Sequence, residues 1–253
     1  MGNQGRDRVF WSLAAVVLSV PFVSGIARMG AYVIASPLDL FEIGLEIESL
    51  LFPLLCSLLG GFPLISQVSE GYLQQVRTRV PIGAYVRGAV ARAGLRAGVV
   101  VAVAVFSWWA FCWWVEPLLG LAHDYGASPA TPPAEMSTFS QLLHTSSLLY
   151  GISYSLWVGL WGALIAALAA VLLIVVPQRL LALALPLIVW WVDNLIWSNL
   201  RHPQFAAVFA VFPGGLTQQP VWTVLVPLTL WGGALAMLLL SLERRRYEVS
   251  ATL

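Results

Sequence analysis

Long apolar runs separated by short polar segments dominate this chain. The runs cover about residues 10–28, 50–66, 97–115, 148–176, 180–197 and 221–240. About 20 apolar residues in a helix that rises about 1.5 Å per residue cross the roughly 30 Å hydrocarbon core of a bilayer. The pattern therefore predicts an all-α, polytopic membrane protein, with residues 1–253 forming a single domain of six transmembrane helices.

Two further segments are predicted as short interfacial or re-entrant helices on the outer side of the membrane. In residues 36–49, the acidic side chains of Asp39, Glu42 and Glu46 recur at helical spacing beside apolar ones, as in an amphipathic helix. Residues 206–212 are apolar but too few to cross a bilayer.

Composition supports a membrane protein and limits its chemistry. Hydrophobic residues make up 59% of the chain and charged residues 10%, whereas a soluble domain carries about 25% charged residues. All 13 basic residues are arginines, so the chain lacks the lysine that a nucleotide-binding P-loop needs. Any ATPase must then be a separate chain, and no cofactor is expected in this one. The net charge of +1 gives no indication of a nucleic-acid partner.

The positions of the arginines predict the orientation. If both termini are cytoplasmic, every arginine except Arg28 and Arg201 lies in a cytoplasmic segment, as the positive-inside rule requires. The tryptophans of residues 108–114 and 190–197 would then lie at the outer membrane interface, where tryptophan is enriched. The expected location is the cytoplasmic membrane, which the chain crosses several times.

The basic segment 67–96 between the second and third runs carries five arginines and one acid, Glu70. Pro81 divides it into two helical pieces. One hypothesis is that its first piece is a short cytoplasmic helix that docks on a partner protein. The alternative is that its arginines only bind anionic lipid and set the topology. The residues expected to contact a partner are Ser69, Glu70, Gly71, Tyr72, Gln75, Arg77 and Arg79.

The chain resembles the permease subunit of type-2 ABC transporters, an exporter class whose permease half has six spans. The matching features are Glu70-Gly71 after the second span, Arg77 and Arg79, Tyr85, and the short apolar segment 206–212. The topology matches along the whole chain, and the motif match is confined to residues 69–85. The chain departs from the family pattern where Val80-Pro81 follows Arg79, and where Arg92 and Arg96 replace a lysine before the third span. These departures leave the boundary of the first helical piece open.

The resemblance implies a function and partners. The segment after the second span would be a coupling helix that seats in a groove of an ABC ATPase. Two ATPase copies, which hold ATP and Mg²⁺, would join two permeases, either identical or homologous. The implied function is export of a hydrophobic or amphipathic cargo. A scaffold or anchor subunit without transport remains the alternative, and an ion-driven carrier is a further one.

Polar residues inside a span are a second candidate site. Asp193 and Asn194 lie in the fifth run, and Arg28 lies at a comparable depth in the first. Charges within a membrane are costly and often functional. We expect Arg28 and Asp193 to form either a gate on the outward path or a structural ion pair. A further alternative is that Asp193 already lies among the outer headgroups.

Enzymatic chemistry is not expected. The three histidines, His123, His144 and His202, lack metal-binding spacing, and none falls inside a span. The sequence Gly151-Ile-Ser-Tyr-Ser155 does not meet the G-x-S-x-G pattern of a serine nucleophile, and its small residues fit close helix packing instead. Cys56 and Cys112 lie in apolar runs and are predicted to be small buried side chains.

Overall fold

The structure is a computed structural model that describes residues 3–69, 82–121, 132–214 and 216–251. Its long helices are α1 (Asn3–Arg28), α2 (Pro37–Ser69), α4 (Ile82–Ala110), α7 (Ser147–Val175), α8 (Arg179–Asn199) and α10 (Leu225–Ala251). Short helical pieces include a π-helix at Phe111–Val115, α5 (Glu116–Leu119), α6 (Pro133–Met136) and α9 (Ala207–Val211). The described residues contain no strand, which confirms the prediction of an all-α fold.

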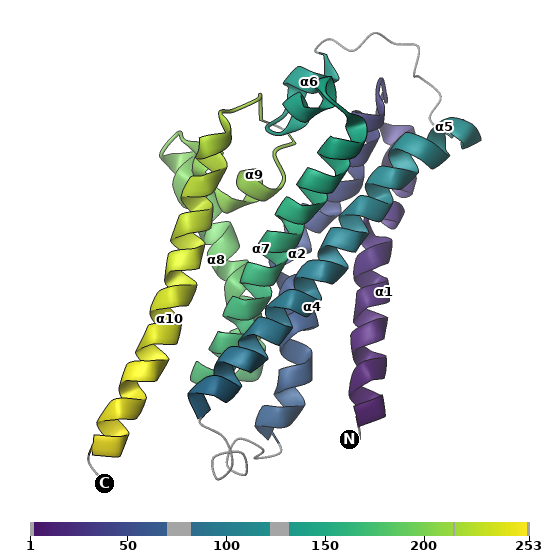
Figure 1. The fold of residues 1–253 in the computed structure, drawn as a ribbon. Helices are drawn as coiled ribbons and strands as arrows, with labels where there is room; N and C mark the ends of the chain where they lie inside the picture. The colour runs from purple at the N-terminus through teal and green to yellow at the C-terminus, as the bar shows by residue number, and fades with distance from the viewer. Residues whose placement is uncertain (1–2, 70–81, 122–131, 215, 252–253) are drawn as a thin grey trace.

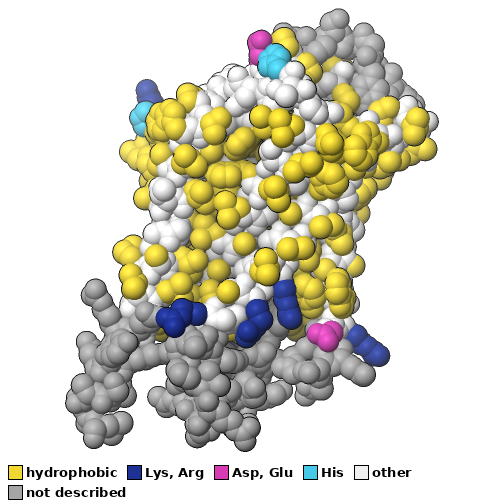
Figure 2. Space-filling model, viewed as in Figure 1, with side chains coloured by type: hydrophobic (Ala, Val, Ile, Leu, Met, Phe, Trp, Pro, Cys, Tyr) yellow, Lys and Arg dark blue, Asp and Glu magenta, His cyan; other side chains and the backbone are white. Residues whose placement is uncertain are grey.

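Six helical segments of the described chain are long and apolar enough to cross a membrane. They are Asp7–Ala31, Pro37–Phe62, Val86–Leu119, Ser147–Val175, Arg179–Asn199 and Val221–Leu242. The long helices run alternately up and down, so α1 begins and α10 ends at the same end of the bundle (Figure 1). Hydrophobic side chains cover most of the height of the face seen in Figure 2, and most of its basic side chains lie at the lower end.

Helix α2 lies at the centre of the bundle, where it packs against α1, α4, α7 and α8. The most extensive helix pair is α4 with α7, and α10 packs mainly along α7. Small residues allow the α4–α7 approach, because a Cβ atom added at Gly98 would lie 2.8 Å from the carbonyl oxygen of Gly159. Small residues at such contacts are typical of membrane helices, which gain little from hydrophobic burial against lipid.

The charge pattern predicted that the acidic segment 36–49 forms a separate interfacial helix, and this prediction is wrong. The segment is the first part of α2, and the second span begins at Pro37 rather than near residue 50. The apolar side chains of Leu38, Phe41 and Leu45 are buried, and the same stripe continues through Phe52. Packing of this continuous stripe in the bundle outweighs the preference of the acidic side chains for the membrane surface.

The third span likewise starts earlier than the charge pattern predicted. Helix α4 begins at Ile82, so Arg87, Arg92 and Arg96 belong to the same helix as the span. All three side chains are exposed, which lets their charged groups reach away from the apolar surface. The Arg96 guanidinium also lies over the ring of Phe10 in α1, 5.8 Å from its centroid.

The tryptophans of the two predicted clusters differ in burial. Trp114 is exposed, but Trp108, Trp109 and Trp190 are completely buried in the helix bundle. Each of these three fills space between helices, and the prediction that they lie at the level of the outer interface stays a prediction. Trp108, for example, donates an N–H hydrogen bond of 3.1 Å to the carbonyl oxygen of Phe41 and is wedged between α1 and α2.

Candidate functional site

Most of the predicted partner-contact residues lie outside the part of the chain that the structure describes. These are Glu70, Gly71, Tyr72, Gln75, Arg77 and Arg79. Ser69 is the last residue of α2. The described residues next to this gap, the last of α2 and the first of α4, lie at the end of the bundle where α1 begins (Figure 1). The assignment of these residues to a docking helix stays a prediction.

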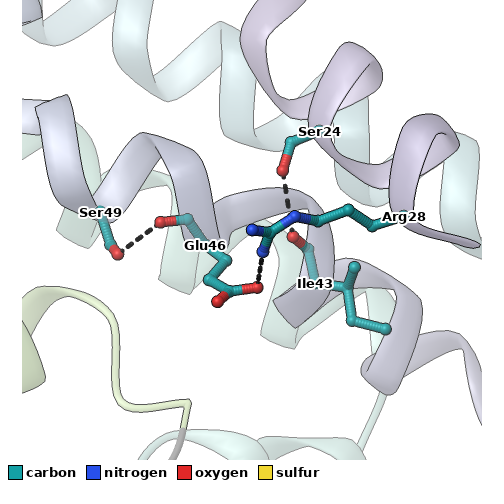
Figure 3. A network of polar contacts seen from close by, with 5 residues as sticks. All are labelled: Ser24, Arg28, Ile43, Glu46 and Ser49. Carbon is teal, nitrogen blue, oxygen red and sulfur yellow. Dashed lines mark hydrogen bonds and ion pairs between the residues drawn. The ribbon is translucent and has the colours of Figure 1, made fainter. Parts of the chain in front are cut away.

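Arg28 forms an ion pair, but its partner is Glu46 and not Asp193. In Figure 3 the guanidinium of Arg28 reaches from the end of α1 to the Glu46 carboxylate on α2. Nearby, the Ser24 hydroxyl donates a hydrogen bond of 3.3 Å to the carbonyl oxygen of Ile43. The sequence expectation of an Arg28–Asp193 pair is therefore wrong, because Glu46, now part of the second span, lies closer to Arg28. This network ties α1 to α2.

Asp193 instead holds the beginning of α9. One carboxylate oxygen accepts a hydrogen bond of 2.7 Å from the backbone N–H of Ala207, the first residue of α9. The other accepts one of 3.1 Å from the indole N–H of Trp197. A carboxylate at a helix N-terminus satisfies an amide that has no partner within the helix. The structure thus gives Asp193 a structural role in α8.

The end of α9 is held from α7. The Tyr154 hydroxyl donates a hydrogen bond of 2.9 Å to the carbonyl oxygen of Val211, and the Trp157 indole N–H donates one of 2.8 Å to that of Ala210. Four of the five residues of α9 are buried. Both ends of this short helix therefore find side-chain partners within the bundle, which is how non-helical backbone is tolerated at membrane depth. The prediction of a short apolar helix between the last two spans is confirmed.

Asn194, the neighbour of Asp193, makes no such contact. Its side-chain oxygen is buried and has no hydrogen-bond partner among the described residues. Nothing in the structure brings it together with Arg28, which is paired with Glu46. The three residues predicted as a gate or ion pair, Arg28, Asp193 and Asn194, thus do not form one site.

Glu48 is a buried acid that the sequence pattern did not single out. It lies 11 residues into α2, roughly 16 Å from the start of the span, and its side chain is completely buried. Neither carboxylate oxygen has a hydrogen-bond partner in the described part of the chain. The sequence did offer one signal for this site, because Glu48 lies only two residues beyond Glu46 and is followed by a long apolar run. It was missed because residues 36–49 were assigned to the membrane surface.

We expect Glu48→Met to increase the free energy of unfolding by about 1–3 kcal/mol. An apolar side chain of similar size removes a buried polar group that lacks a partner. The measurement is thermal unfolding of the purified chain in detergent. The matched control is Glu46→Met, whose ion pair is half exposed and should change stability by less than about 1 kcal/mol. A loss of stability in Glu48→Met would contradict the absence of a partner for this carboxylate.

The candidate metal and nucleophile residues lie apart or have structural contacts where the structure describes them. His144 and His202 are exposed, and no group of three potential metal ligands occurs in the described ranges. His123 lies outside those ranges. The Ser155 hydroxyl donates a hydrogen bond of 2.6 Å to the Gly151 carbonyl oxygen one turn earlier. Gly151 packs against the Trp109 ring, which agrees with close helix packing.

Comparisons with models of protein families, with curated proteins and with solved structures found no match to this chain. Its assignment therefore depends on the chain itself. Five long apolar helices accompany the central helix α2, and both described ends of the chain lie at the same end of the bundle (Figure 1). The chain is a multi-pass membrane protein.

Proposed function

We propose that this chain is the permease subunit of an ATP-driven ABC exporter, and that it moves a hydrophobic or amphipathic cargo across the cytoplasmic membrane. A separate ATPase chain, in two copies, would hold ATP and Mg²⁺. A second permease, identical or homologous, would complete the transport path. Both termini and the segment between α2 and α4 would lie in the cytoplasm.

The observation that carries this proposal is where α2 ends and α4 begins, on either side of residues 70–81. Both of these helix ends lie at the end of the bundle where α1 begins and α10 ends (Figure 1). Arg87, Arg92 and Arg96 are exposed on the first turns of α4, near the same end. A partner that binds residues 69–79 would thus act directly on the ends of two long helices.

The packing of α2 supports a coupling role for that segment. A helix transmits a displacement along its length because its backbone hydrogen bonds resist stretching. Helix α2 is a single helix of 33 residues that contacts α1, α4, α7 and α8. A force applied at its lower end would therefore reach most of the bundle. The buried helix α9 between α8 and α10 adds to the likeness with the exporter class.

The test is co-purification of the full chain, tagged at its C-terminus, with an ATPase. We expect the wild type to recover a chain that has a P-loop and hydrolyses ATP, and the triple variant Glu70→Ala/Arg77→Ala/Arg79→Ala to lose it. Arg201→Ala is the control, because this exposed arginine lies at the opposite end of the bundle. Both variants should retain the elution profile of the wild type in size-exclusion chromatography.

Two results would overturn the proposal. One is recovery of no ATPase under conditions that keep membrane complexes intact. The other is recovery of a partner without ATPase activity, still through Arg77 and Arg79, which would instead favour a scaffold subunit.

A further inference from the structure

A cavity of about 350 Å³ lies near the upper end of the bundle, away from the predicted docking segment. Its walls come from Tyr32, the first four turns of α2, the first two turns of α7 and residues 208–214. Binding cavities for small molecules have volumes of about 300–1,000 Å³. The space is therefore large enough for a small organic molecule.

The cavity has an acidic side made by two carboxyl groups. Glu42 and Glu46 both line it. Glu46 is neutralised by Arg28, as Figure 3 shows. The described residues provide no ion pair for Glu42, whose carboxylate lies against Gly214. A Cβ atom at position 214 would be only 3.2 Å from Oε2 of Glu42. The glycine thus leaves room for this carboxylate at the cavity wall.

The remaining walls are largely aromatic. They include Tyr32, Tyr150, Tyr154, Phe209 and Phe212. The rings of Tyr150 and Tyr154 are stacked, with centroids 5.6 Å apart and planes inclined by 14°. Aromatic faces attract cations, and the attraction strengthens where water is excluded.

Tyr150 contributes a polar group to the cavity wall. Its side chain is 1% exposed and lines the cavity, yet its hydroxyl takes part in no hydrogen bond between described residues. The neighbouring Tyr154 hydroxyl, by contrast, is bound to Val211. The hydroxyl oxygen is not among the completely buried atoms without a partner, so it keeps some accessible surface. The Tyr150 hydroxyl is therefore free to bond a polar group of a molecule in the cavity.

We infer that this cavity binds an organic cation, an amine or quaternary ammonium group attached to an apolar body. Glu42 balances the positive charge, the aromatic rings surround it, and the Tyr150 hydroxyl contacts a polar atom of the ligand. A bare metal ion fits poorly, because hard cations take about six to eight oxygen ligands and the described residues hold no cluster of three acidic or metal-ligating groups. This inference does not depend on the export proposal, since it concerns binding alone.

The test is equilibrium binding of radiolabelled benzyltrimethylammonium to the purified full chain in nanodiscs. Choline should displace the probe, whereas 3,3-dimethylbutan-1-ol, which has the same shape without the charge, should not. Glu42→Gln should raise the dissociation constant roughly tenfold, because it removes the opposing charge. Glu42→Asp keeps the charge and should retain most of the binding. Glu135→Gln, an exposed acid on α6 outside the cavity wall, is the matched control and should bind as the wild type does.

Four outcomes would overturn the inference. The first is no saturable binding by the wild type. The second is equal displacement by the alcohol and by choline, which would indicate a merely apolar cavity. The third is equal affinity of the Glu42→Gln and Glu135→Gln variants. Displacement by sodium at the concentrations at which choline acts would assign the site to an inorganic cation and would also reject an organic one. The displacement experiments use the wild type and thus remain decisive if Glu42→Gln does not fold.

Discussion

Replacing Gly44 with alanine should destabilise the bundle by about 3 kcal/mol, near the upper end of the usual cost of overpacking. A Cβ atom at Gly44 would lie 2.2 Å from the indole nitrogen of Trp108, and one at Gly25 would lie 2.3 Å from the other edge of the same ring. The indole thus fills a slot between a glycine of α1 and a glycine of α2. The ring cannot shift to accommodate an added methyl group, because it is completely buried and packs on Phe22 and Phe111.

The measurement is the midpoint temperature of thermal unfolding in detergent, with the fraction of monodisperse protein as the signal. Gly233→Ala is the matched control, because a Cβ atom there would meet nothing within 4 Å. That substitution should leave stability unchanged or raise it slightly, since alanine favours a helix over glycine. If Gly44→Ala and Gly233→Ala unfold at the same temperature, the slot around Trp108 does not exist as described.

The second large effect is expected at Asp193. Asp193→Ala leaves the buried amide of Ala207 and the indole N–H of Trp197 without their acceptor, which should cost about 2–3 kcal/mol. Asp193→Asn keeps one acceptor oxygen and should therefore lower the stability by less than Asp193→Ala does. Asn194→Ala removes an amide whose buried oxygen already lacks a partner in the described chain, and it should be nearly neutral.

Hydrogen exchange followed by mass spectrometry would locate this effect. Amides of residues 207–211 should exchange faster in Asp193→Ala than in the wild type, while those of α4 should change little. Unchanged exchange in α9 would contradict the anchoring role of Asp193. A ligand or gating role for Asp193 would instead affect function without this local loosening.

The sequence predicted the helices better than it predicted their extent and contacts. The apolar runs are long, so length alone indicated all six spans and the short helix between the last two. The start of α2 was missed because Asp39, Glu42 and Glu46 suggest a membrane surface when only periodicity is considered. Their actual surroundings depend on α1 and on residues 208–214, which are distant in the sequence.

Charge partners could not be derived from the sequence for the same reason. Depth along a span can be estimated from the residue number, and it placed Arg28 and Asp193 at similar levels. The rotation of each helix and the identity of its neighbours are set by packing, which a single sequence does not reveal. Arg28 therefore meets Glu46, and Asp193 meets a backbone amide. The docking residues 69–79 remain a prediction from the motif.

The attachment of α9 at both ends limits how the bundle can move. Asp193 of α8 holds one end of this short helix, and Tyr154 and Trp157 of α7 hold the other. If α8 slid along α7 by more than a fraction of an ångström, at least one of these three hydrogen bonds would break or α9 would have to travel with both helices. Helices α7, α8 and α9 are thus braced into one rigid block. An opening of the bundle that preserves these three hydrogen bonds therefore leaves the arrangement of α7, α8 and α9 unchanged.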